Sequence, residues 1–194
     1  MRRWLAGRAQ RQLEQIRRRQ REGISIKQQE IGALPRHQTL RATLDWSHDL
    51  LSADEQQLLV CLSVFRSTFT HAAAVAVFGR PLVVLDDGLS GLVAKSLVAT
   101  DLIGDAMAYR LLETTREYAG ERLAGSSMAR DVARRHALYM QALLRQAETE
   151  RNEHAQATWA ITHARWVDDL RAAVNWAFSP EGDVCLGISL MAWS

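Results

Sequence analysis

The sequence predicts a mainly α-helical protein that contains one small domain of three helices and a terminal β-hairpin. Three observations predict this fold. Apolar residues recur at three- and four-residue spacing through most of the chain from Thr39 onward. Helix-start signals stand immediately before these apolar patterns. One stretch, residues 96–111, instead has two short runs around a glycine turn, which is typical of a hairpin.

The first expected helix covers Thr39–Leu51, and the second follows directly. Ser52-Ala53-Asp54-Glu55 has the form of a capping box, in which the serine oxygen accepts a backbone N–H and the glutamate returns to the serine N–H. Thr70 is placed to cap a short alanine-rich helix that ends at Phe78. Gly79-Arg80-Pro81 then breaks the helix.

A third helix of this group is expected over residues 83–95, with Leu85, Leu89, Leu92 and Val93 facing inward. Two strands follow, Ser96–Thr100 and Ala106–Leu111, and Gly104 lies in the turn between them. Three helices and a hairpin in this order predict a winged-helix domain. The chain after the hairpin reads as helical to its end, with a break at Pro180-Glu181-Gly182.

The composition is that of an ordinary soluble globular protein, with 47% hydrophobic and 24% charged residues among 194. No apolar run reaches the roughly 18 residues that a membrane span requires, and the basic N-terminus lacks the apolar core of a secretory signal. We therefore expect a cytoplasmic protein. The six histidines form no pair four residues apart, and Cys61 lies in an apolar helix pattern, so we predict a buried structural thiol and no metal site.

Positive charge is concentrated in the first thirty residues, which hold nine Lys/Arg and three Asp/Glu, a net charge of +6 in a chain whose total is +2. Two interpretations remain open. The arm can be a solvated helix without a specific partner, or it can bind nucleic acid, anionic lipid or an acidic protein surface. The residues that would contact nucleic acid are Arg2, Arg3, Arg17, Arg18, Arg19 and Arg21.

DNA binding by the winged-helix domain itself is possible but not favoured. The helix in the recognition position carries Asp86 and Asp87 and only one cation, Lys95, at its far end. From Ser52 to Leu112 there are four Lys/Arg and six Asp/Glu. Carboxylates near a phosphate backbone oppose association, since duplex binding depends on cations that neutralise phosphates.

Several segments resemble a known family. They are LPRHQTLRATLDWSHDLLSADEQQLLVCLSVF (34–65), YRLLETTREYAGERL (109–123) and WVDDLRAAVNWAFSPEGD (166–183). They are similar to the segment that follows the nucleotide-binding core in bacterial STAND-type (NB-ARC-like) ATPase transcriptional regulators. The resemblance covers roughly residues 34–194 and implies a winged-helix domain at 36–115 and the truncated start of tetratricopeptide-like helices at 116–194. The charge distribution and the breakers Gly23, Gly32 and Pro35 add a basic arm and linker at 1–35.

The ATP/ADP site of that family is not encoded in this chain. No GxxxxGK[ST] motif occurs, and the nearest string, Gly120–Ser127, has serine where the phosphate-binding lysine belongs. We expect that string to be a helix C-terminus with Gly125 as a left-handed cap. The resemblance puts Tyr109 and Arg110 at a nucleotide-sensor position, although Arg110 can equally pair with Glu113.

No catalytic residues and no cofactor are predicted. Asp168 and Asp169 are adjacent on a helix and point about 100° apart, so we expect them to be solvent-exposed, and no GxSxG elbow presents a nucleophile. The resulting interpretation is a non-catalytic relay fragment of a STAND-type regulator that contacts a separate nucleotide-binding domain or self-associates through exposed C-terminal helices. The alternative is a transcriptional regulator that binds nucleic acid through the arginine-rich arm.

Overall fold

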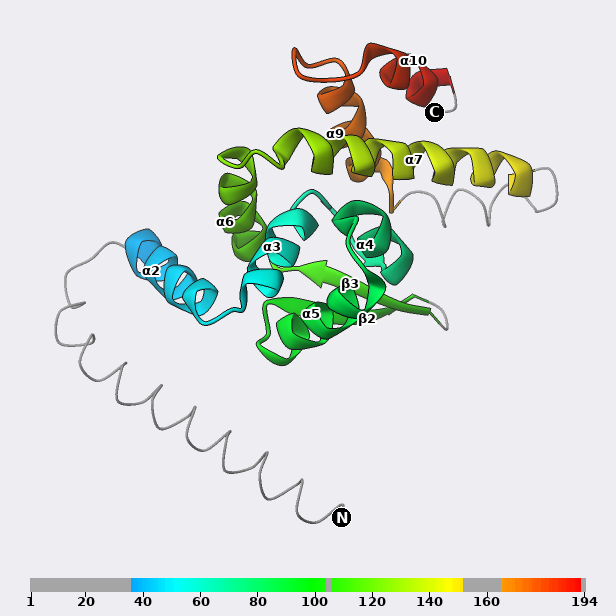
Figure 1. Ribbon diagram of the computed structural model, residues 1–194. Helices are drawn as coiled ribbons and strands as arrows, with labels where there is room; N and C mark the ends of the chain where they lie inside the picture. Colours follow the sequence, from blue (N-terminus) through cyan, green and yellow to red (C-terminus); the bar gives the residue numbers. More distant parts are fainter. Residues whose placement is uncertain (1–35, 104–105, 152–164, 193–194) are drawn as a thin grey trace, which may run out of the picture. The chain divides into compact units, whose positions relative to one another are not determined.

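A computed structural model describes residues 36–103, 106–151 and 165–192 (Figure 1). The chain forms two compact units, Met1–Trp46 and Ser47–Ser194. The helix α2, Arg36–Asp49, begins in the first unit and ends in the second. Everything described below lies within the second unit. The described part is mainly helical, as the sequence predicts.

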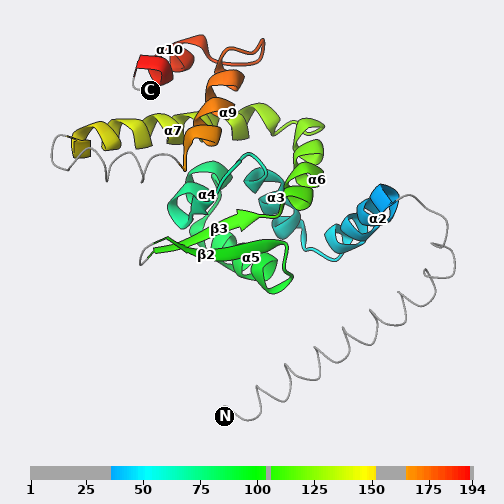
Figure 2. The same cartoon turned by 180° about the vertical axis from the view of Figure 1, so that it is seen from behind.

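The winged-helix fold is built from helices around a small sheet. Its elements are α3 (Ala53–Leu62), β1 (Phe69–Thr70), α4 (His71–Phe78), α5 (Leu82–Ala94), β2 (Val98–Ile103) and β3 (Ala106–Leu111), followed by α6 (Glu113–Ala124). Seen from behind, the β2–β3 hairpin lies across α5 and next to α4 (Figure 2). The core is apolar and includes the fully buried side chains of Leu58, Leu62, Val77 and Leu92.

Local signals set the helix boundaries, and two of the predicted caps are confirmed. The Ser52 hydroxyl accepts from Glu55 N at 3.2 Å, and the Glu55 carboxylate accepts from Ser52 N at 2.8 Å. The Thr70 hydroxyl accepts from Ala73 N at 3.2 Å. Gly79 ends α4 with φ of 66°, a left-handed conformation that glycine adopts without steric cost.

The left-handed cap predicted at Gly125 is wrong. Gly125 has φ of −82°, a conformation that any residue can adopt, and its N–H bonds to Glu121 O. The next amide, Ser126 N, bonds to Leu123 O, so α6 ends in a tightened turn. The Ser126 hydroxyl donates to Leu123 O at 2.7 Å and satisfies a carbonyl of the last turn. A left-handed residue is therefore not needed there.

The sheet contains a short strand that the sequence does not predict. Its order is β1-β3-β2, with both pairs antiparallel. Phe69 lies opposite Tyr109, and Thr70 lies opposite Ala108. Two residues are too few to show an alternating pattern, and Thr70 also serves as the cap of α4. The predicted hairpin is present, with Leu102 opposite Met107 near its tip.

The helical region after α6 contains α7 (Ala129–Arg151), α9 (Val167–Ala177) and α10 (Val184–Ala192). These helices pack on one another around a second core formed by Ala137, Met140, Ala173, Leu186 and Leu190. Figure 1 shows α7 running between α4 on one side and α10 on the other, with α9 crossing it. Their likeness to tetratricopeptide repeats remains a prediction. None of the helices searched among the described residues is both long and apolar enough to cross a bilayer.

Candidate functional site

The helix α5 is the second helix of the helix-turn-helix formed with α4, which is the position that reads the major groove in DNA-binding members of such folds. Leu85, Leu89 and Leu92 recur at four- and three-residue spacing and are buried. The opposite side is solvent-exposed, and Val83 retains 71% of its accessible surface. The exposed side chains there are Leu82, Val83, Asp86, Asp87 and Ser90. This face is apolar and acidic.

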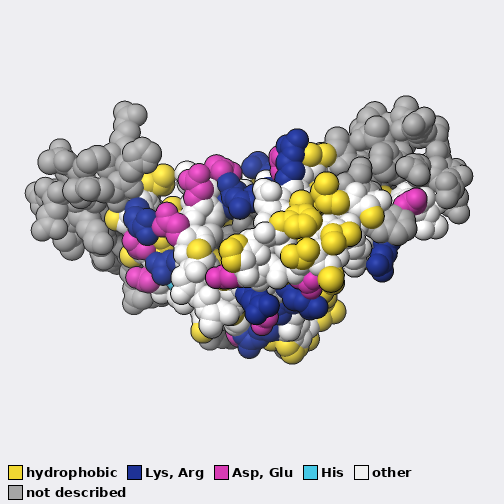
Figure 3. Space-filling model, turned by 90° about the horizontal axis from the view of Figure 1, so that it is seen from above, with side chains coloured by type: hydrophobic (Ala, Val, Ile, Leu, Met, Phe, Trp, Pro, Cys, Tyr) yellow, Lys and Arg dark blue, Asp and Glu magenta, His cyan; other side chains and the backbone are white. Residues whose placement is uncertain are grey.

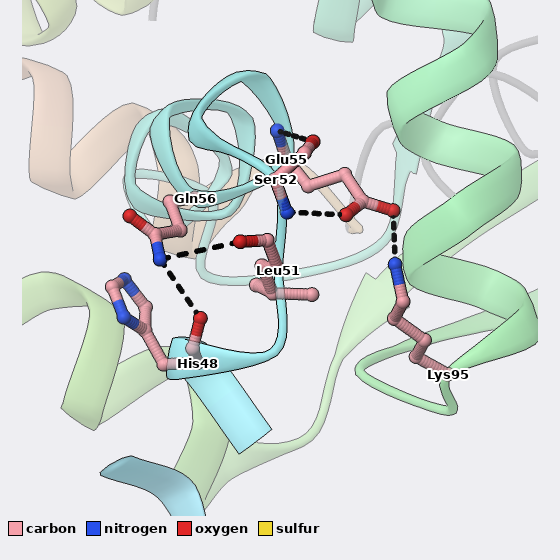
Figure 4. Close-up of polar contacts among 6 residues, drawn as sticks. All are labelled: His48, Leu51, Ser52, Glu55, Gln56 and Lys95. Carbon is pink, nitrogen blue, oxygen red and sulfur yellow. Dashed lines mark hydrogen bonds and ion pairs between the residues drawn. The ribbon is translucent and has the colours of Figure 1, made fainter. Parts of the chain in front are cut away.

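Both cations that flank α5 are held by carboxylates of α3. The Lys95 ammonium bonds to one oxygen of Glu55, whose other oxygen accepts from Ser52 N (Figure 4). The Arg80 Nη1 donates to Asp54 Oδ1 at 2.7 Å and to Gln57 Oε1 at 2.6 Å. Each cation has therefore already been paired within the domain.

The Glu55 carboxylate is the centre of this arrangement, and its side chain is only 11% exposed. Burial raises its pKa, but hydrogen bonds from Lys95 and from the Ser52 backbone outweigh that effect and leave the pKa below its usual value. Gly91 makes room for it, since a methyl group at that position would collide with the carboxylate. The glycine at position 91 of α5 therefore allows Glu55 to form its ion pair with Lys95.

A groove of about 510 Å³ lies between α5 and the hairpin. Its lining includes His71, Asp86, Met107 and Tyr109, and His71 Nε2 lies 2.6 Å from Asp86 Oδ1. Leu102 and Met107 are cross-strand neighbours on this side of the hairpin, and both are more than half exposed. We call the exposed surface formed by Leu82, Val83, Asp86, Asp87, Leu102 and Met107 the α5–wing face.

Tyr109 and Arg110, the predicted nucleotide-sensor residues, do not converge. Tyr109 lines the groove and donates to Met107 Sδ at 3.4 Å. Its ring stacks on Phe69 with centroids 6.0 Å apart. Arg110 is exposed and follows Tyr109 on a strand, where successive side chains point to opposite faces.

The expected pair of Arg110 with Glu113 is replaced by a different one. Arg116 donates to the Glu113 carboxylate from Nε at 3.2 Å and also from Nη2. The i,i+3 spacing within α6 brings these two side chains together on the helix surface. The six arm arginines lie outside the described residues, so the structure gives no geometry for the predicted nucleic-acid contact.

A buried polar cluster joins the winged helix to the helical region, and sequence reasoning missed it. Asp169 of α9 is 3% exposed, and its carboxylate accepts from Arg66 N at 2.7 Å and from the Ser67 hydroxyl. His136 Nε2 lies 3.5 Å from Asp169 Oδ1, which is long for a hydrogen bond. The expectation that Asp169 is solvent-exposed is therefore wrong, whereas Asp168 is exposed and pairs with Arg171.

The electrostatics of this cluster favour an ionised Asp169. Burial raises the pKa of the carboxyl, but the His136 imidazole, the Ser67 hydroxyl and the Arg66 amide together hold the pKa below its usual value. No local sequence signal marks Asp169, because its partners on the α3–β1 loop lie about a hundred positions earlier. The charge is stabilised by tertiary structure alone.

The described residues contain no group of three His, Cys, Asp or Glu side chains placed to hold a metal ion. Cys61 is buried, as predicted, and burial raises the pKa of its thiol to about 11. Cys185 is exposed. A thiol with so high a pKa is almost wholly protonated at neutral pH and is a poor nucleophile or metal ligand.

The fold and its helix-turn-helix agree with comparisons to known proteins. Residues 51–124 match the family of winged helix-turn-helix domains. This match covers α3 to α6, including the α5–wing face.

Several mycobacterial proteins are similar to this chain. The chain is 43% identical over 150 residues to the Mycobacterium tuberculosis H37Rv protein named "Putative HTH-type transcriptional regulator Rv0890c". It is equally similar to the Mycobacterium bovis protein named "Putative HTH-type transcriptional regulator Mb0914c". Each alignment covers 75% of this chain and 17% of the relative, so the chain spans about a sixth of their length. It is also 37% identical over 108 residues to "Uncharacterized protein Rv0894" of M. tuberculosis H37Rv, covering 51% of this chain and 26% of that protein.

Proposed function

We propose that this chain is a non-catalytic regulatory module of an HTH-type transcriptional regulator, and that its winged helix contacts protein through the α5–wing face. The names of the mycobacterial relatives support the regulatory role. The single observation that carries the protein-contact mechanism is the character of the α5–wing face. It is apolar and acidic, and both flanking cations are already paired with α3.

Duplex DNA would meet an unfavourable surface on α5. Two exposed carboxylates, Asp86 and Asp87, would lie near phosphates, and no free cation remains on this helix to release counterions. A protein partner, by contrast, can cover the exposed apolar side chains of Val83, Leu102 and Met107 and offer a cation to the aspartates. The resemblance to STAND regulators makes a nucleotide-binding domain on a separate chain the first partner to test.

The relay is supported by the polar cluster around Asp169. That side chain of α9 binds the backbone and side chain of the loop between α3 and β1. A displacement of α9 would therefore also displace the α3–β1 loop of the winged helix. We propose that the helical region passes its state to the α5–wing face by this route.

The test is copurification of the chain with a separately expressed STAND-type nucleotide-binding domain. The variant Val83→Glu adds a charge to the α5–wing face and is expected to weaken binding at least tenfold, about 1.4 kcal/mol. The matched control is Val167→Glu, which adds the same charge to an exposed valine on α9. The mechanism is refuted if wild-type chain and Val83→Glu bind equally.

A second candidate function, nucleic-acid binding through the arm, is favoured by the net charge of +6 over residues 1–30. Gel-shift assays across a salt series separate the two functions. The arm function requires binding that weakens steeply with salt and disappears when residues 1–30 are deleted. Sequence-specific binding that survives this deletion and is lost in Ser90→Ala would instead show DNA recognition by α5.

A further inference from the structure

A cavity of about 300 Å³ lies where the winged helix meets the helical region. Phe65, Phe69 and Ala73 line it from the winged helix, and Leu143 and Trp166 line it from the helical region. Small-molecule sites typically enclose about 300–1,000 Å³ with mostly apolar walls and a few placed polar groups. The cavity has the size and apolar lining of such a site for a small ligand.

A cation faces this cavity without an anionic partner among the described residues. The Nε of Arg165 is buried and has no hydrogen-bond partner there. Its guanidinium carbon lies 5.3 Å from the centre of the Trp166 ring, which fixes the group against the wall. A buried donor without a partner costs free energy, and the Arg165 side chain keeps its positive charge at the cavity wall.

No hydrogen bond or ion pair joins Arg165 to the carboxylate of Asp169 among the described residues. Asp169 also lines the cavity, but its two oxygens accept from the Arg66 amide and the Ser67 hydroxyl. The Tyr139 hydroxyl, 3.4 Å from the Thr70 hydroxyl, adds a second polar group to the cavity wall. Thr68, Thr70 and Gln146 are further polar side chains in the lining, and Arg165 is its one cation among the described residues.

We propose that this cavity binds a small apolar carboxylate, with the carboxylate on Arg165 and the apolar body against the side chains of Leu143 and Trp166. Guanidinium and carboxylate groups match in charge and in planar geometry. The ring-lined walls favour an aromatic or short aliphatic body. This inference concerns a different site from the α5–wing face and does not depend on the proposed function.

A ligand in this position would touch both the winged helix and the helical region. It would bind the folded protein and not the unfolded chain, and it would therefore raise the melting temperature. A ligand at a hundredfold excess over its Kd is expected to raise Tm by about 5–10 °C in a chain of this size. The effect must saturate with concentration.

The experiment measures Tm of the full chain with benzoate, phenylacetate and octanoate, and with the three corresponding neutral amides. At least one carboxylate is expected to raise Tm in a saturable manner, and its amide is expected to bind at least tenfold more weakly. Arg165→Gln is expected to abolish the preference for the acid. Arg171→Gln, which removes an exposed arginine of α9, is the matched control and is expected to keep that preference.

Three results would overturn the proposal. They are no Tm shift with any carboxylate, equal shifts with acid and amide, and an acid preference that persists in Arg165→Gln. If Arg165→Gln does not fold, Leu143→Trp supplies the test, because an indole there fills the cavity and must abolish the shift. A shift retained in that variant also overturns the proposal.

Discussion

At the scale of single residues, the neighbours Asp168 and Asp169 have opposite environments. Asp168 is 69% exposed and pairs with Arg171 on the surface of α9, whereas Asp169 is buried against the α3–β1 loop. Asp169→Ala removes the acceptor of both the Arg66 amide and the Ser67 hydroxyl. We expect it to lower the free energy of unfolding by about 1–3 kcal/mol, the cost of buried donors left without an acceptor. Asp168→Ala should cost less than about 0.5 kcal/mol, and urea denaturation measures both.

The pH dependence gives a second measurement on Asp169. The folded-state pKa lies below the ordinary value of 3.8, so the carboxylate stabilises the fold fully at pH values well above 3.8. That stability is lost as the pH falls from the unfolded pKa through the folded one. Asp169→Asn should therefore flatten the acid side of the stability curve. An acid limb of unchanged slope would show that Asp169 is not ionised in the folded protein.

The two cysteines should differ in reactivity. Burial raises the pKa of Cys61 to about 11, while Cys185 is exposed on α10. A thiol reagent at pH 8 is expected to modify Cys185 rapidly and to leave Cys61 unmodified until the chain unfolds. Mass spectrometry of the labelled peptides checks this. Equal labelling of both thiols in the native protein would contradict the burial of α3.

At the scale of elements, close contact between α3 and α5 depends on glycine. A methyl group at Gly88 would approach Leu58 Cδ2 to 2.9 Å, and one at Gly91 would collide with the Glu55 carboxylate. Gly91→Ala should displace Glu55 from Lys95 and from the capping box, at a cost of about 1–3 kcal/mol in the free energy of unfolding. Ser90→Ala, on the exposed side of the same helix, should change stability by about 0.5 kcal/mol or less. Thermal unfolding of both variants tests the contact.

Prediction from sequence succeeded where a short segment fixes its own structure. The Ser52 capping box and the Thr70 cap depend on residues three positions apart, and the inward leucines of α5 depend on helical periodicity. Prediction failed where the local structure depends on contacts with segments that are distant in the sequence. The two-residue strand β1 exists only because β3 pairs with it, and Asp169 is buried only because the α3–β1 loop supplies its donors. The sequence predicted the acidic character of the exposed side of α5, but it did not predict that Lys95 pairs with Glu55.

At the scale of the whole molecule, α10 carries an apolar stripe on its outer side. Val184, Ile188 and Met191 recur at four- and three-residue spacing and are 54%, 60% and 57% exposed, while Leu186 and Leu190 are buried on the inner side. Viewed from above, hydrophobic side chains gather over this part of the surface (Figure 3). Exposed apolar surface in the C-terminal helices was predicted, and the exposed stripe on α10 confirms it for the described residues.

The stripe leads to the prediction that the isolated chain self-associates. Covering three large apolar side chains in a dimer contributes favourable transfer free energy of about 25 cal/mol per Å². Sedimentation should therefore show a concentration-dependent association that Ile188→Glu abolishes. Val83→Glu, which alters the separate α5–wing face, should leave the association unchanged. A monomer at all concentrations would contradict the prediction.

The hydrogen bond from the Arg66 amide to Asp169 joins positions 103 apart in the sequence. The Arg66 amide proton exchanges with deuterated solvent when α9 moves away from the loop. The exchange rate of this amide therefore reports the frequency of those openings. A single NMR resonance thus reports how often the helical region detaches. A signal that weakens the packing of the C-terminal helices would raise the exchange rate of the Arg66 amide. A molecule that stabilises this packing would lower that rate.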